Sequence, residues 1–214
     1  MSAMRNYLIP LYELRREQVV INSRFIATLA PAFSTEEARG FIARIKKEYA
    51  DASHHVPAYI IGGRNTVTEY SSDDGEPSGT AGRPVLAVLR GSGLGDVAVV
   101  VTRYFGGTRL GTGGLVKAYT ESTQLVVNAA GRGRRIPVYV ALTAVPYNLL
   151  ERVRLLVSKN HGEVLGEDFA ADITMTLQFP TDAFDEFQNE LRELSAGKLA
   201  AEVIETRETT VAVI

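Results

Sequence analysis

A glycine- and arginine-rich segment at residues 131–135 divides this chain of 214 residues into two stretches of unlike charge. Residues 1–135 carry 17 Lys and Arg against 12 Asp and Glu, whereas residues 136–214 carry 6 against 13. Two glycines alternate with three arginines just before Pro137, a composition typical of the joint between domains. We therefore expect two small domains, residues 1–135 and residues 136–214, each with its own core.

The composition excludes several classes of protein. Hydrophobic residues make up 45% of the chain and charged residues 22%, which is usual for a globular protein. The absence of cysteine excludes disulfides, thiolate zinc sites and cysteine nucleophiles. No apolar run approaches the roughly 20 residues of a membrane helix, and the first residues lack the apolar segment of a signal peptide. We expect a soluble, cytoplasmic protein without a membrane partner.

The second stretch has the pattern of a ferredoxin-like domain. Residues 138–145 are rich in β-formers, and apolar residues then recur at helical spacing from Leu149 to Val157. Two strands follow at residues 164–168 and 173–179, and a last strand is expected at residues 199–206. Between them lies a helix whose apolar stripe runs from Phe184 to Leu194 and which ends near Gly197. Asn148 and Thr181 are the predicted N-caps of the two helices. The order βαββαβ predicts a ferredoxin-like fold, which hosts many functions and identifies none.

The first stretch predicts an α+β domain. Residues 12–21 and 24–30 have the composition of strands joined by a turn at Asn22 and Ser23. A helix should begin at Ser34, because Glu37 follows at the spacing of a capping box. The continuous β-branched run at residues 97–102 indicates a central strand that is buried on both faces. Two further strands are expected at residues 56–61 and 66–71.

The most informative chemistry lies between residues 62 and 114, which hold 13 of the 19 glycines. In the second half of this region a buried strand ends, a glycine-rich turn follows, and a helix begins near Gly113. The first amides of a helix lack intrahelical partners, and glycine lets an anion approach them closely. We therefore expect an anion or nucleic-acid site that consists of Arg83, Arg103, Tyr104, Arg109, Gly111, Thr112, Gly113, Gly114 and Lys117. The alternative is that Thr112 only caps the helix and the glycines only form turns.

A second group of candidates combines histidines with acidic residues. Its members are His54, His55, Asp73, Asp74 and Glu76. Adjacent residues of a strand point to opposite faces, so the two histidines cannot both ligate one ion. The acidic run Asp73-Asp74-Gly75 is typical of a turn, and the group lacks the spacing of metal ligands. We therefore expect no metal and no cofactor.

Three segments together resemble the signature of a known family. They are DDGEPSGTAG at residues 73–82, VVTRYFGG at 100–107 and LGTGGLVKAY at 110–119, and they resemble the IMPACT family, including its bacterial YigZ and YvyE members. The resemblance implies a first domain like the second domain of a small-subunit ribosomal protein and domain IV of elongation factor G. It also implies a ferredoxin-like second domain like the later domains of that factor. Eukaryotic relatives regulate translation through the amino-acid-starvation kinase pathway.

These observations support three hypotheses about function. The first is a non-enzymatic, translation-associated regulator that binds RNA, the ribosome or a translation factor through the predicted anion site. The alternative is an enzyme that binds a small-molecule or nucleotide phosphate, a phosphotransferase or hydrolase, with Asp73 or Asp74 as Mg²⁺ ligand or base. The third is a protein-binding module that uses the acidic residues on and before the last helix, Asp182, Asp185, Glu186, Glu190 and Glu193.

Overall fold

The computed structural model describes residues 7–63 and 66–213, which fold into two compact units. The division lies between Arg134 and Arg135, and residues 211–213 join the first unit. Strand β7 (Arg132–Val145) runs through this point, so the segment that we expected to be a break is the start of a strand. The short strand β1 (Ile9–Pro10) pairs with it and stabilises an extended backbone that the local composition disfavours.

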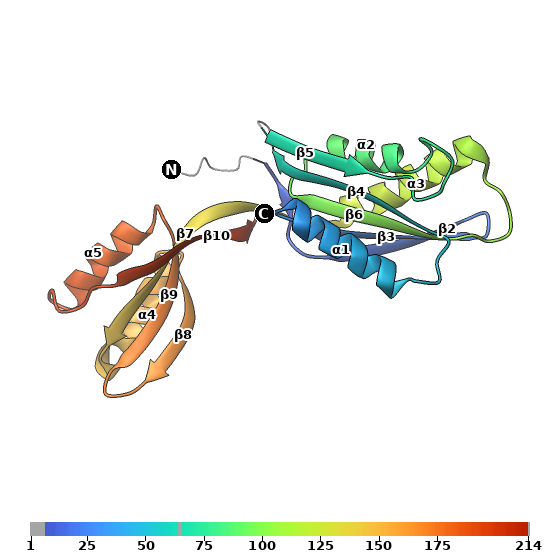
Figure 1. The fold of residues 1–214 in the computed structure, drawn as a ribbon. Helices are drawn as coiled ribbons and strands as arrows, with labels where there is room; N and C mark the ends of the chain where they lie inside the picture. The colour runs from blue at the N-terminus through green and yellow to red at the C-terminus, as the bar shows by residue number, and fades with distance from the viewer. Residues whose placement is uncertain (1–6, 64–65, 214) are drawn as a thin grey trace. The chain divides into compact units, whose positions relative to one another are not determined.

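The first unit is built on a five-stranded antiparallel sheet, drawn from blue to green in Figure 1. The strand order is β2 (Leu14–Val20), β3 (Ser23–Pro31), β6 (Val97–Tyr104), β4 (His54–Gly63) and β5 (Thr66–Ser71). The predicted central strand is confirmed, because β6 lies in the middle and its residues 97–102 are fully buried. Ile21 and Asn22, both with positive φ, form the β2–β3 turn one residue earlier than predicted.

Helix α1 (Thr35–Glu48) covers one face of this sheet. The Oγ of Ser34 accepts a hydrogen bond from the Glu37 amide, so the predicted N-cap is confirmed. The Glu37 carboxylate accepts a hydrogen bond from the amide of Phe33 instead of that of Ser34. The buried side of α1 packs on residues of β3, β4 and β6, in a core that contains Ala30, Ala38, Phe41, Ile45, Tyr59, Ala98 and Val100.

Two helices, α2 (Gly82–Ser92) and α3 (Gly111–Ala129), cover the opposite face. Helix α3 was predicted and begins two residues earlier than expected, whereas α2 was not predicted. The larger core of the unit lies here, and its bulky members include Phe25, Leu29, Val85, Leu89, Leu115, Tyr119 and Val126. The signature segments at residues 73–82 and 110–119 therefore lie at the starts of α2 and α3, on one side of the sheet.

The second unit confirms the predicted ferredoxin-like fold. After β7 come a 3₁₀ turn (Tyr147–Leu149), α4 (Leu150–Lys159), β8 (Glu163–Phe169), β9 (Ile173–Pro180), α5 (Phe184–Leu194) and β10 (Glu202–Ala212). The strand order is β10-β7-β9-β8, and α4 and α5 pack on one core with the strands. No helix in the described part of the chain is long and apolar enough to span a membrane.

Both predicted N-caps in this unit are wrong. Asn148 lies inside the 3₁₀ turn after Pro146, and no side chain caps α4. The amide of Thr181 donates to the carbonyl of Pro137, which extends the pairing of β9 with β7 by one residue. A turn at Ala183 then separates Thr181 from α5. Sheet pairing therefore determines where α5 begins, and the local capping signal does not.

Candidate functional site

The three signature segments meet at a buried cluster of three side chains, one from each segment. The Nη1 of Arg103, on β6, and the hydroxyl of Tyr119, on α3, each donate to Oε1 of Glu76 at 2.7 Å. The side chains of the ion pair are only 6% and 3% exposed, and Tyr119 is fully buried. Burial and then the Glu76 charge raise the pKa of Tyr119, so its hydroxyl remains a donor. The cluster joins residues 73–82 to β6 and α3, and it places Arg103 in the core.

Residues 73–82, here called the Asp73 loop, are wound around the Asp73 carboxylate. Oδ2 accepts from the amide of Gly79 at 2.8 Å, and Oδ1 accepts from those of Ala81 at 3.1 Å and Gly82 at 2.9 Å. Burial raises the pKa of Asp73, but these three amides and the charge of Arg83 outweigh burial and lower it overall. This side chain serves as the anion at the start of α2, which explains why α2 can begin without an ordinary N-cap.

The remaining acidic and histidine candidates also bind groups of the protein itself. Asp74 accepts from the amide of His55 at 2.7 Å and pairs with Lys46 at 2.6 Å. The Nδ1 of His54 contacts the Asp74 carbonyl at 2.8 Å, whereas Nε2 of His55 contacts the carbonyl of Tyr49 at 2.8 Å. The two histidines therefore point to opposite faces, as predicted. Asp73 and Asp74, the proposed Mg²⁺ ligands of the enzyme hypothesis, are already engaged.

The start of α3 differs from that of α2. Leu110 occupies the N-cap position without a side-chain hydrogen bond, and the first turn contains no acidic residue. Thr112 lies inside the helix, so it does not cap it. Gly111, Thr112 and Gly113 are exposed residues, and within the described part of the chain no carbonyl or side chain accepts a hydrogen bond from their amides. These amides can therefore receive an external anion.

The cations of the predicted site fall into two groups. Arg109 is exposed just before the start of α3, and Lys117, 75% exposed, lies 3.8 Å from Glu121 on the same helix. Arg83 is exposed near the start of α2. Arg103 is buried with Glu76 and does not contribute a free charge. The hydroxyl of Tyr104 donates to Asp51 at 2.8 Å, and Gly114 is half-buried against Leu110.

Phe105 is the exposed aromatic side chain of this region. The Arg103 guanidinium lies 5.4 Å from the ring of Phe25 and 5.5 Å from that of Phe105. The Phe105 amide donates to Ser53 Oγ at 3.1 Å, and the Gly106 amide donates to Ser23 Oγ at 3.3 Å. Phe105 is nevertheless 49% exposed. The ring is thus held in position from the protein side and open to solvent on the other.

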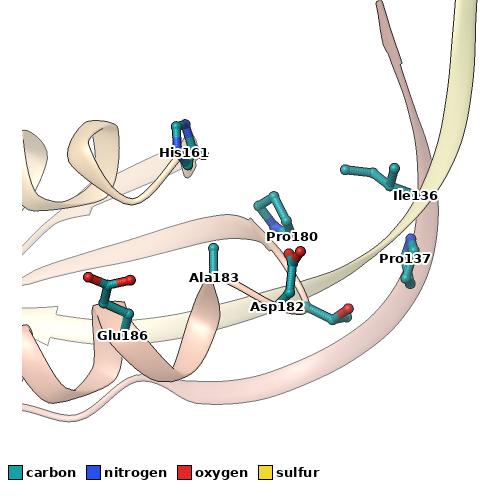
Figure 2. Close-up of a pocket in the computed structure, with 8 residues that line it drawn as sticks. Ile136, Pro137, His161, Pro180, Asp182, Ala183 and Glu186 are labelled. Atoms are coloured by element: carbon teal, nitrogen blue, oxygen red, sulfur yellow. The ribbon is translucent and has the colours of Figure 1, made fainter. Parts of the chain in front are cut away.

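A cavity of about 390 Å³ lies in the second unit, between the end of α4 and the start of α5. Figure 2 shows the imidazole of His161 apart from the carboxylates of Asp182 and Glu186. In the residues that the structure describes, no group of three His, Asp or Glu side chains is placed to hold a metal ion. The cavity is therefore lined by two acidic side chains without a set of metal ligands.

Comparison with known proteins finds similar sequences along most of the chain. Residues 21–127 match the Impact N-terminal domain, and residues 143–198 match a domain of unknown function (DUF1949). An IMPACT family member from Haemophilus influenzae is 37% identical over 206 residues, which covers 96% of this chain and all of the relative. IMPACT family member YigZ from Escherichia coli is 35% identical over 203 residues, with 94% and 100% covered.

One solved structure is similar over nearly its whole length. It is described as the crystal structure of a hypothetical protein, is 35% identical in sequence and superposes with a TM-score of 0.62. The match covers 95% of this chain and 99% of that one. The two-domain layout is therefore shared by this solved relative.

Proposed function

The chain belongs to the IMPACT family, and from this premise we propose that it acts in translation by binding RNA, free or within the ribosome. The proposed binding site is the β6–α3 segment, residues 105–114, at one end of the first sheet (Figure 1). The link to translation rests on the family resemblance, since eukaryotic members regulate translation. The binding chemistry rests on the geometry of this segment.

The observation that carries the proposal is the uncapped start of α3. Its exposed amides lack a partner within the described residues, and Arg109 and Lys117 add positive charge beside them in the sequence. A phosphate group supplies the negative charge and the acceptor oxygens that such a helix start lacks. The first domain carries the excess of basic residues, and the second domain, which is acidic, would repel a polyanion.

Phe105 supports RNA over an isolated anion as the ligand. Single-stranded RNA is commonly bound by stacking its unpaired bases on exposed aromatic rings beside positive charge. Phe105 has this exposure, and Arg103 behind the ring and two serine hydroxyls on the backbone fix its position. A rigid ring loses little conformational entropy when a base stacks on it. The segment therefore offers both a phosphate contact and a stacking surface.

The phosphate contact is tested by removing its cations. Arg109→Gln and Lys117→Gln together should weaken binding of a single-stranded RNA, measured by fluorescence anisotropy at several salt concentrations. Each lost phosphate contact should reduce the slope of log Kd against log salt by about 0.7. Arg90→Gln is the matched control, because this surface arginine pairs with Glu69 and should leave the slope unchanged. Salt-insensitive binding of RNA by the unmodified protein would contradict the proposal. Binding only to a purified translation factor would show that the partner is a protein and not RNA.

The stacking contact is tested separately at Phe105. Phe105→Ala should weaken RNA binding by about 1 to 3 kcal/mol, whereas Phe105→Tyr should retain most of it, because only the alanine removes the ring. The salt slope should stay the same in both variants, since no charge changes. Circular dichroism of each variant checks that the protein still folds. Equal affinities of the Ala and Tyr variants would exclude stacking on this residue.

A further inference from the structure

We propose that strand β5 pairs antiparallel with β5 of a second copy of this chain and so joins the two five-stranded sheets into one. Strands β2 and β5 are the outer strands of the sheet in the first unit (Figure 1). Within the described residues, no group outside the sheet forms a hydrogen bond to the main chain of residues 67–70. An outer strand with free amides and carbonyls is a template for a further strand. This inference goes beyond the proposed function, because β5 contains none of residues 105–114.

The two outer strands differ in how they are protected against such pairing. Natural sheets block an outer strand with charged side chains, proline or a bulge. Strand β2 carries three charged residues in succession, Arg15, Arg16 and Glu17. Two of them are held in ion pairs, Arg15 with Glu48 at 2.8 Å and Glu17 with Arg24 at 2.8 Å. The β2 edge is therefore protected by charge.

Strand β5 lacks these features along its length, residues 66–71. Its sequence, TVTEYS, contains no proline and no basic residue, and its register with β4 is continuous. Valine, threonine and tyrosine favour strands. Val67 and Tyr70 are each 45% exposed, and the single charge of the strand, Glu69, is paired with Arg90 of α2. The β5 edge is therefore open, and it presents neutral side chains that favour strand pairing.

The charge of this edge favours a neutral strand as its occupant. A basic segment finds no free carboxylate on β5, because Arg90 already pairs with Glu69, and an acidic segment is repelled by that carboxylate. A second copy of β5 supplies a strand of matching length and charge, and one twofold pair covers both open edges. The remaining outer strands of such a dimer are the two protected β2 strands, so pairing ends at two copies.

The position of Glu69 selects the register of the pair. In a twofold antiparallel pair, one residue lies directly opposite its own copy. A pair centred on Glu69 places two carboxylates opposite each other, and like charges in this position are destabilising. A pair centred on Thr68 places Glu69 opposite Val67 of the second copy and lets the two threonine hydroxyls form a hydrogen bond. Thr68 therefore lies at the centre of the pair.

Cysteine cross-linking tests this register, because the chain has no cysteine of its own. Directly opposite Cα atoms of an antiparallel pair lie about 4.5 to 5.5 Å apart, within the range that a disulfide spans. Thr68→Cys in the full chain should therefore form a disulfide-linked dimer with oxidised glutathione, seen on a non-reducing gel. Tyr70→Cys should not, because its two copies lie about 13 Å apart along the strands. Cross-linking of Tyr70→Cys as efficient as that of Thr68→Cys, or none of Thr68→Cys, would overturn the proposed pairing.

Sedimentation of the full chain over a range of concentrations measures the association itself. We expect the unmodified chain to show a monomer–dimer equilibrium. Thr68→Lys should weaken dimerisation by at least about tenfold, because the two lysines lie directly opposite each other. Val19→Lys, at an exposed position of the β2 edge, is the matched control and should leave dimerisation unchanged. Circular dichroism of both variants checks that they fold.

Three results would refute the pairing of β5 with its copy. A dimer that Thr68→Lys does not weaken, or that Val19→Lys weakens equally, would form through another surface. A chain that remains monomeric at millimolar concentration would leave the edge to an extended segment of a different protein. Loss of dimerisation in Thr68→Lys at unchanged RNA affinity would support this inference, and a failure to dimerise with intact RNA binding would overturn this inference alone.

Discussion

Two glycine-rich segments of the first domain use their backbone amides in opposite ways. In the Asp73 loop, the amides of Gly79, Ala81 and Gly82 donate to the carboxylate of Asp73. In the β6–α3 segment, the amides at the start of α3 meet no acceptor in the described residues. Glycine content therefore does not distinguish a structural loop from a binding loop. The distinction lies in whether the protein provides the anion itself.

The largest expected effect tests whether the Asp73 loop is structural. Glu76→Ala leaves the buried guanidinium of Arg103 without its counter-charge and Tyr119 without its acceptor. We expect the free energy of unfolding to fall by about 3 to 5 kcal/mol, as for other buried ion pairs that lose one partner. Urea unfolding followed by circular dichroism measures this.

Glu69→Ala is the matched control for this change. Its carboxylate pairs with Arg90 at the surface, where an ion pair contributes at most about 1 kcal/mol. A cost for Glu76→Ala no larger than that of Glu69→Ala would mean that the cluster does not hold the three signature segments together. If Glu76→Ala instead lost RNA binding at unchanged stability, Glu76 would belong to the RNA-binding site.

The difference between the two segments could be predicted only in part from the sequence. The glycines, the strand before them and the start of α3 are local signals, and all three were identified. The partner of Arg103 is not local, because Glu76 lies 27 residues away and meets it only when the sheet forms. The same applies to α2, which contains glycines and Pro84 and begins where the distant Asp73 carboxylate caps it.

The pairing of β4 with β5 shows the same limit. Both strands and the helix that begins at Ser34 were predicted from the sequence. The contact of Tyr59 with Tyr70 depends on the register of the two strands, which a prediction of the individual strands does not determine. This contact is not encoded in a contiguous motif.

A smaller effect is expected when the anion of the Asp73 loop is made neutral. Asp73→Asn should lower the free energy of unfolding by about 2 to 4 kcal/mol at neutral pH, because three amides lose a charged acceptor. The folded-state pKa of Asp73 is lowered, so its contribution is complete above the unfolded pKa of about 3.9 and is lost as the pH falls through the folded value. The difference between the two proteins should therefore shrink in acid.

Unfolding curves recorded from neutral pH down into the acid range measure this prediction. Asp51→Asn serves as the control, because Asp51 is exposed and its amide analogue still accepts from Tyr104. A constant difference between Asp73→Asn and the unmodified protein at all pH values would show that the charge of Asp73 contributes nothing, and that shape alone organises the loop.

The smallest effects come from adding one methyl group to each segment. A Cβ at Gly82 would lie 2.7 Å from the backbone of Ser72, so Gly82→Ala should cost about 1 to 3 kcal/mol of stability. A Cβ at Gly113 meets nothing within 4 Å, and alanine favours the helix, so Gly113→Ala should gain up to about 1 kcal/mol. The same methyl group would obstruct the close approach of a phosphate to the α3 amides. Gly113→Ala should therefore be more stable and bind RNA more weakly, and a variant that gains stability while keeping its full affinity would remove these amides from the binding site.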